Sequence, residues 1–451
     1  MKKRVFTLVL TVLCIFQMKS EIKISNLFSD GFVLQQNTSA PIWGTAPQGT
    51  EITVIGSWDN KEVKVEADNK GKWIAYLDTP PGGKDSYTVS VNETIIKDVL
   101  IGEVWICSGQ SNMLFRLGSS WGDYWTVQSD NNPEIRFFEV GVKRSTTPLN
   151  DVAGIWRYGV VPGNMQHISA VGYYFARMLQ HNLKVPVGMI GAYQGGTSAE
   201  EWTKKEAFDS CSELKGTYVN SSAPVGSLYN GMIAPILPYK NSGIIWYQGE
   251  NNAGRGKTYK KLINVMVDDW RSGFNQSILP FYIVQLTSFS SDWREFREIQ
   301  KSIADDMVNS GLAVTIDGGD LNDIHPPKKK IVGDRLGYMA LAKVYGQDYP
   351  ISSPEYRKHI VEDNKIRVYF DHVKTGLTQT GKEEYPLYFE IAGNDGVYLP
   401  SQARIEGNTI VVWNEEITNP VHVRYFWRSY GEPNIFTSDF NMPIIPFRTD
   451  K

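Results

Sequence analysis

The sequence predicts an α/β protein, in which helices cover both faces of a parallel central sheet and a β unit stands at each end. Between residues 99 and 350, apolar runs alternate with segments of helical periodicity, which is typical of a parallel sheet buried on both faces. Residues 21–98 and 351–451 hold short alternating segments between turn-rich clusters, which indicates β-structure. The length of 451 residues allows two or three domains.

The first twenty residues predict a signal peptide. Lys2, Lys3 and Arg4 form a positive region, and an apolar core follows from Val5 to Phe16. That core is short for a membrane span, although an N-terminal membrane anchor is the alternative. With cleavage near Ser20, we expect a secreted or periplasmic protein without a membrane span in its mature form.

Residues 21–98 predict a small N-terminal β-sandwich-like domain. Four strand-like segments recur there, separated by turn clusters such as 68–71 and 80–83. The segments are 32–34, 52–55, 73–77 and 87–91. We expect packing to be their main role, with sugar binding as the alternative.

Residues 99–350 predict the catalytic domain. Strand-like runs occupy 188–192, 243–247, 280–285 and 312–316. Helical patterns occupy 169–183, 259–270, 295–309 and 328–344. Residues 115–165 lack clean periodicity, so we expect a long insertion or mixed loop there. The final segment, 351–451, returns to short β segments and predicts a C-terminal β domain.

The net charge and the cysteines argue against a nucleic-acid-binding protein, a disulfide scaffold and a metal site. The net charge is -3, and the run Lys328-Lys329-Lys330 indicates a solvated helix start rather than a nucleic-acid surface. Cys107 and Cys211 form neither a disulfide framework nor a metal-ligand spacing, although a bridge between them stays open. The sequence therefore predicts no metal, no cofactor and no nucleic-acid partner.

The segment 109–113, Gly-Gln-Ser-Asn-Met, directly follows the apolar run 104–107. A strand, a tight turn and a helix start at this place would present the Ser111 hydroxyl at the carboxyl end of a strand. Gly109 permits the sharp turn, and the Ser111 N–H would face a developing oxyanion. An ordinary polar turn is the alternative.

Three further polar stretches follow predicted strands. They are Gly195-Gly196-Thr197, the segment 248–252 that begins with Gln248, and the segment 320–326 that holds Asp320, Asp323 and His325. Because ligand sites in parallel sheets lie at the carboxyl ends of the strands, we expect these stretches to meet Ser111. Together they supply a nucleophile, a base, a carboxylate and oxyanion donors, which an ester hydrolase needs.

These blocks, in this order, resemble the sialate O-acetylesterase family of the SGNH hydrolases. The segments 229–235 and 423–427 are similar as well, and the resemblance covers nearly the whole mature chain. It implies an SGNH-hydrolase-like fold, with Ser111 as nucleophile and His325 as base. It also implies the Ser111 N–H, the Gly196 N–H and the Gln248 side chain as the oxyanion hole.

The third member of the triad departs from the family pattern. Many SGNH enzymes place Asp three residues before the histidine, where this chain has Asn322. Asp323 is the first candidate and Asp320 the second. A Ser–His dyad, with a backbone carbonyl that orients His325, is the third.

The resemblance leads us to expect a carbohydrate O-acetylesterase acting on O-acetylated sialic acid, with the 9-position as the first ester. Acetylated xylan or another polysaccharide is the alternative substrate. A non-catalytic sugar-binding protein on an old hydrolase fold is the alternative of another class, and it predicts a disrupted catalytic pair. We expect Glu250 to be a buried structural acceptor rather than an acid or base.

Overall fold

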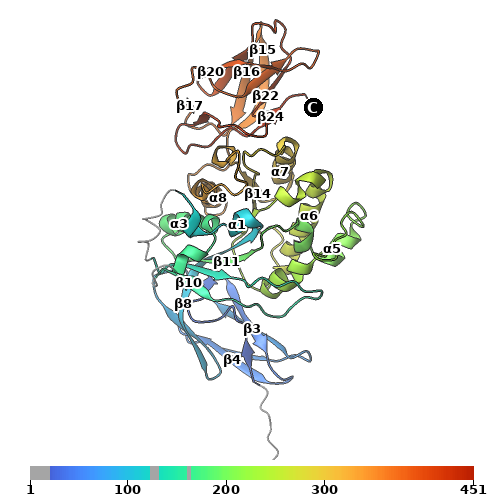
Figure 1. Ribbon diagram of the computed structural model, residues 1–451. Helices are drawn as coiled ribbons and strands as arrows, with labels where there is room; N and C mark the ends of the chain where they lie inside the picture. The colour runs from blue at the N-terminus through green and yellow to red at the C-terminus, as the bar shows by residue number, and fades with distance from the viewer. Residues whose placement is uncertain (1–20, 122–131, 160–163, 451) are drawn as a thin grey trace, which may run out of the picture.

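The structure of the protein is a computed structural model that describes residues 21–121, 132–159 and 164–450. A central α/β body lies between an N-terminal β unit and a C-terminal β unit at its opposite end (Figure 1). The predicted signal peptide falls outside the described residues, so its cleavage stays a prediction. No helix in the described ranges is long and apolar enough to cross a membrane.

The central sheet confirms the predicted α/β class. Its strands follow the order β10-β9-β11-β8-β12-β13-β14. In that order they are Trp156–Tyr158, Ile135–Glu139, Val187–Tyr193, Thr94–Gly109, Ile244–Tyr247, Phe281–Val284 and Ser310–Ala313. Neighbours from β9 to β14 pair in parallel, while β10 at the edge pairs antiparallel.

Strands β9 and β10 lie within 115–165, where we predicted an insertion or mixed loop. The sequence hides them because they contain only five and three residues and irregular chain surrounds both. Strand β9 is stabilised by its pairing with β10 and β11 on either side, and its short sequence pattern does not indicate this pairing.

Helices cover both faces of the central sheet. On one face lie α3 (Ala170–Leu183) and α8 (Lys329–Lys343), and on the other lie α6 (Gly256–Gly273) and α7 (Arg294–Asp306). Successive strand residues therefore bury in opposite directions. Trp105 meets Phe175 of α3 with ring centroids 4.9 Å apart, whereas Trp246 meets Trp270 of α6 at 5.9 Å.

The N-terminal unit is built mainly from antiparallel strand pairs, although one of its strands, Val33–Gln35, pairs in parallel with β8. One sheet contains β1 (Lys23–Ile24), β3 (Ser39–Thr45) and β6 (Lys72–Asp78), and the other strands are β2 (Val33–Gln35), β4 (Glu51–Gly56), β5 (Glu62–Glu66) and β7 (Tyr87–Val91). The first part of β8 pairs with β7, and the same strand then continues into the central sheet. The predicted boundary at residues 98 and 99 thus falls inside a continuous strand.

The C-terminal unit contains two four-stranded antiparallel sheets and one strand pair. Their members are β15 (Glu355–Glu362), β16 (Lys365–Asp371), β21 (Thr409–Trp413) and β20 (Gln402–Glu406); β19 (Leu399–Pro400), β18 (Phe389–Ala392), β22 (His422–Tyr425) and β24 (Phe447–Arg448); and β17 (Leu377–Gln379) with β23 (Ile435–Thr437). Buried Arg297 of α7 joins the unit to the central body by donating to the carbonyls of Arg428 and Ser429, each at 2.8 Å.

Short helical segments follow the carboxyl ends of the central strands. They are α1 (Ser111–Leu114) after β8, α4 (Ala199–Trp202) and α5 (Lys205–Ser210) after β11, η5 (Glu250–Arg255) after β12, and η6 (Ile316–Gly318) after β14. The remaining turns are η1 (Leu117–Ser119), η2 (Asn164–His167), η3 (Tyr229–Ile233) and η4 (Ala234–Ile236). All four predicted chemical stretches consequently gather at one edge of the sheet. Cys107 and Cys211 are free thiols, so no disulfide joins them.

Candidate active site

Ser111 is the first residue of α1, directly after the turn that ends β8. The turn requires glycine at position 109, where φ is +136° and an added Cβ would lie 2.1 Å from the carbonyl oxygen of Tyr247. The side chain of Ser111 is thereby presented at the strand's end. Among the described residues, its backbone N–H has no acceptor.

His325 meets Ser111 from a loop between η6 and α8. Its Nε2 lies 2.8 Å from Ser111 Oγ, which is hydrogen-bond distance. Burial lowers the pKa of His325 below its ordinary value, and the charge of Lys329 lowers it further, while Asp323 opposes both effects. The imidazole is therefore largely neutral near pH 7 and able to accept the serine proton.

The two candidate carboxylates bind backbone groups of the His325 loop. Asp323 Oδ1 accepts the backbone N–H of His325 at 2.7 Å. Asp320 Oδ1 accepts the N–H groups of Asn322 and Asp323 at 2.8 and 3.0 Å. Within the described part of the chain, neither carboxylate binds the imidazole ring, so the structure presents a Ser–His pair on a carboxylate-braced loop.

The glycine pair after β11 lies beside Ser111. A Cβ added to Gly195 would be 3.5 Å from the Cβ of Ser111, so the loop passes in van der Waals contact with the serine. Gly196 has φ +69°, and its N–H, like that of Ser111, has no acceptor among the described residues. Neither predicted backbone donor thus has an acceptor within the described residues, and the glycine loop that carries one of them lies in contact with Ser111.

Gln248 departs from the predicted arrangement. Its side chain is fully buried, and its Nε2 donates to the carbonyl of Thr197 at 3.1 Å and to Asn252 Oδ1 at 2.7 Å. Its Oε1 accepts from Tyr259 Oη at 3.0 Å. Since both amide hydrogens already have acceptors, Gln248 braces the glycine loop in this structure and is not free to donate to an oxyanion.

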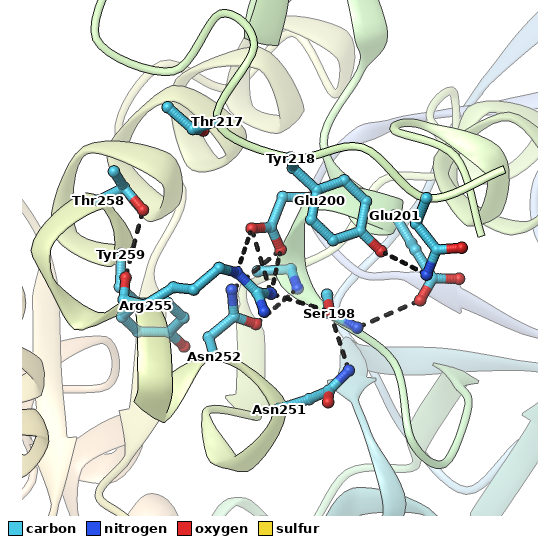
Figure 2. A network of polar contacts seen from close by, with 12 residues as sticks. Ser198, Glu200, Glu201, Thr217, Tyr218, Asn251, Asn252, Arg255, Thr258 and Tyr259 are labelled. Carbon is cyan, nitrogen blue, oxygen red and sulfur yellow. Dashed lines mark hydrogen bonds and ion pairs between the residues drawn. The ribbon is translucent and has the colours of Figure 1, made fainter. Parts of the chain in front are cut away.

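A polar network that the sequence did not predict continues from the glycine loop (Figure 2). The exposed amide of Asn251 donates to the carbonyl of Gly196 at 3.2 Å and to Ser198 Oγ at 2.8 Å. Arg255 donates from Nη2 to the same Ser198 Oγ at 3.1 Å and lies 5.4 Å above the ring of Tyr218. These side chains form a polar wall that contacts the glycine loop.

Arg255 is held by a buried carboxylate but remains accessible. Glu200 is almost fully buried, and its oxygens lie 3.4 Å from Nε and Nη2 of Arg255. The arginine side chain keeps 38% of its surface exposed, and its Nη1 has no acceptor in the described ranges. The serine and histidine motifs of the sequence do not indicate this arginine, because its position depends on the short η5 segment that ends with it.

Lys329 also differs from its prediction. We expected the lysine run to be solvated, yet Lys329 is 1% exposed and donates to Asn112 Oδ1 at 2.5 Å. The neighbours Lys328 and Lys330 are not buried. Glu250 is a structural acceptor, as we expected, because its Oε1 accepts from Asn112 Nδ2 at 2.5 Å.

An α/β fold with a serine–histidine pair at the carboxyl ends of its strands defines a serine hydrolase of carboxylic esters. The model of the family described as "Carbohydrate esterase, sialic acid-specific acetylesterase" matches residues 101–331, just over half of the chain. The chain belongs to this family, as the ordered motifs predicted.

Named relatives agree with the family. Sialate O-acetylesterases from mouse and human are each 28% identical to the chain over 406 and 380 residues, and each match covers 72% of this chain with 74% and 71% of the relative. The crystal structure of a carbohydrate acetylesterase from Xanthomonas citri superimposes with a TM-score of 0.86 at 31% identity. That match covers 96% of this chain and 100% of the other.

Proposed function

We propose that this carbohydrate esterase removes acetyl groups from O-acetylated sialic acids, with the 9-O-acetyl ester as its first substrate. The observation that carries the chemistry is the 2.8 Å contact between Ser111 Oγ and His325 Nε2. The names of the mammalian relatives support the choice of sialic acid. The Xanthomonas relative is named only for carbohydrate acetyl groups, so a polysaccharide ester such as acetylated xylan is the second candidate.

In the proposed first step, Ser111 Oγ attacks the acetyl carbonyl while His325 Nε2 takes its proton. The N–H groups of Ser111 and Gly196 would stabilise the oxyanion. Collapse of this intermediate releases the sugar hydroxyl, which takes the proton from His325, and leaves an acetyl-enzyme. His325 then activates water, and acetate leaves as Ser111 is restored.

Asp323 would assist His325 through charge and loop geometry rather than through a ring hydrogen bond. Its oxygen holds the backbone of His325, and its charge favours the imidazolium that forms during the attack. This assignment keeps Asp323, the first candidate, in an indirect role beside a Ser–His pair, and it does not use the backbone carbonyl of the third alternative. Asp320 would have a structural role, because its oxygen accepts the N–H groups of Asn322 and Asp323 in the turn that follows it.

Arg255 is the proposed contact for the sialic acid carboxylate. An arginine is the side chain best suited to a carboxylate, with which it forms parallel hydrogen bonds. The exposed surface of Arg255 and the unpaired Nη1 leave it able to receive one, while Glu200 holds the guanidinium in place. A neutral sugar would instead use this wall through its hydroxyls.

The experiment is acetate release from 9-O-acetylated sialic acid and, in parallel, from acetylated xylan, by the wild type and by Ser111→Ala. We expect release from sialic acid that the substitution abolishes. Release from xylan alone would keep the mechanism and overturn the substrate. Release from neither, with folded protein, would favour the sugar-binding alternative, although that alternative predicts a disrupted pair and the structure shows an assembled one.

We also propose that the chain is exported, to the periplasm or beyond the cell. The positive and apolar regions of residues 1–20 support this proposal. N-terminal sequencing of the protein from its native host tests it, because export with cleavage predicts a mature chain that begins near residue 21. A mature chain that still begins with the charged residues would contradict it.

A further inference from the structure

Asn112, the residue after the serine, lies at the centre of a buried polar cluster. The side chain is 1% exposed. Its Nδ2 donates to Glu250 Oε1 at 2.5 Å and to the carbonyl of Ile324 at 3.0 Å, and its Oδ1 accepts from Lys329 Nζ at 2.5 Å. Asn112 therefore uses both of its amide hydrogens and its oxygen on three separate segments of the chain.

The cluster touches both halves of the catalytic pair. Asn112 adjoins Ser111 in the sequence, and Ile324 adjoins His325. The hydrogen bond from Asn112 to the Ile324 carbonyl thus ties the segment that carries the serine to the loop that carries the histidine. The link lies one residue away from each member of the Ser111–His325 pair.

Two ionisable side chains, Lys329 and Glu250, lie within this cluster, and burial disfavours the charged form of each. Lys329 is packed near the rings of Phe115 and Tyr247, with Nζ 4.8 and 5.5 Å from their centroids. Burial lowers the pKa of Lys329 to about 7, against the opposing charges of Glu250 and Asp323. Burial also raises the pKa of Glu250, whose Oε2 has no partner in the described ranges. Buried charges are weak contributors to stability, so their presence here calls for another role.

We propose that Asn112 and Lys329 are positioning residues, which hold Ser111 and His325 at reacting distance. Glu250 anchors the other side of the Asn112 amide. This inference rests on the proposed Ser111–His325 chemistry and adds to it two residues that touch neither the acetyl group nor the sugar. The reach of the cluster across α1, η5 and α8 explains how the site is assembled before substrate binds.

The charges around His325 give this proposal a readout that a merely structural role would not move. The charge of Lys329 lowers the pKa of His325 and that of Asp323 raises it, while Ser111 Oγ lies 2.8 Å from the imidazole Nε2. Two groups from other elements act on Lys329. The charge of Glu250, which lies in η5, opposes the fall in its pKa, and the ring of Tyr247, which ends β12, lies 5.5 Å from its Nζ. Removal of the Lys329 charge should therefore raise the pKa of His325.

The test uses the full chain and 4-nitrophenyl acetate, a substrate without a sugar. Two near-isosteric variants, Asn112→Asp and Lys329→Met, are compared with Lys343→Met as the matched control. Lys343 lies in the same helix and donates from Nζ to the Ser310 carbonyl at 2.6 Å, away from the pair. The measurements are kcat, KM, the pH profile of kcat/KM, and thermal unfolding.

We expect Asn112→Asp to lower kcat by about 100-fold with little change in KM, because a carboxylate would oppose Glu250 and the Ile324 carbonyl. We expect Lys329→Met to lower kcat by about 10-fold or more and to move the acidic limb of the profile to higher pH. Lys329→Arg should restore the position of that limb, and Lys343→Met should leave it unchanged.

The proposal is overturned if Asn112→Asp keeps kcat within about threefold of the wild type, or if Lys329→Met leaves the acidic limb in place. If the two residues had a purely structural role, their substitution would lower the unfolding temperature without moving the acidic limb of the pH profile. If the Asn112→Asp protein does not fold, the pH profile of the Lys329→Met protein decides whether the proposal stands. Ser111→Ala separates this failure from a failure of the proposed function, because turnover close to that of the wild type in this variant would reject the nucleophile itself.

Discussion

His325 Nε2 lies 2.8 Å from Ser111 Oγ, although 214 positions separate the two residues in the chain. One residue follows the central strand β8 and the other lies in the loop before α8. The two meet because parallel strands direct their carboxyl ends to the same edge of the sheet. The proposed base and the proposed nucleophile therefore lie within hydrogen-bond distance of each other.

The pH dependence of the reaction should reflect His325. Because burial and Lys329 lower the pKa of His325 below 6.5, the imidazole stays neutral to lower pH than an ordinary histidine. Only the neutral form accepts the serine proton, so kcat/KM should rise through this pKa and then level off. A profile of 4-nitrophenyl acetate hydrolysis checks this, and an acidic limb centred clearly above 6.5 would contradict it.

Asp323→Asn should have a mild effect on rate and a defined effect on the pH profile. The amide oxygen can still accept the His325 backbone N–H, so we expect kcat to fall by about 10-fold or less. Loss of the negative charge removes the influence that raises the pKa of His325, so the acidic limb should move to lower pH. A loss of about 10⁴-fold would instead identify Asp323 as the ring partner of a full triad.

Gln248→Leu should weaken folding rather than only catalysis. The substitution leaves the Thr197 carbonyl, Asn252 and the Tyr259 hydroxyl without their buried partner. We expect a loss of about 1–3 kcal/mol in the free energy of unfolding, measured by urea denaturation. Unchanged stability with a kcat reduced by about 100-fold would restore Gln248 to the oxyanion hole.

The class of fold and the serine–histidine pair follow from the sequence because each depends on a local pattern. Apolar runs at 188–192 and 243–247 mark strands, and the polar segments after them mark the edge where ligands bind. The sheet then places Ser111 and His325 together by topology alone. The same reasoning fails for β9 and β10, which are too short to display a period.

Side-chain direction is the part of the site that the sequence could not supply. Gln248 follows a strand at the correct edge, yet its amide turns to Thr197 and Asn252. Lys329 stands in a run of three lysines and is nevertheless buried, because one position of a helix faces Asn112 while its neighbours face away. Spacing fixes which residues reach an edge, whereas packing fixes which atoms point into the site.

Arg255→Ala should separate substrate recognition from chemistry. We expect KM for 9-O-acetylated sialic acid to rise by about 10-fold or more, since a charge-assisted bidentate contact is lost. Hydrolysis of 4-nitrophenyl acetate should not change, because that ester has no carboxylate. Arg294→Ala is the matched control, as Arg294 forms an exposed pair with Asp292 on another helix. Equal KM values for the two variants would contradict the assignment of Arg255.

The covalent step at Ser111 is tested most directly by mass spectrometry of enzyme quenched in acid during turnover of 4-nitrophenyl acetate. We expect an acetyl group on the peptide that contains Ser111, and none in the Ser111→Ala protein, whose turnover should fall by at least about 10³-fold. Ser119→Ala, an exposed neighbour, should behave as the wild type. An acetyl group on a different residue, or full turnover by the Ser111→Ala protein, would contradict the mechanism.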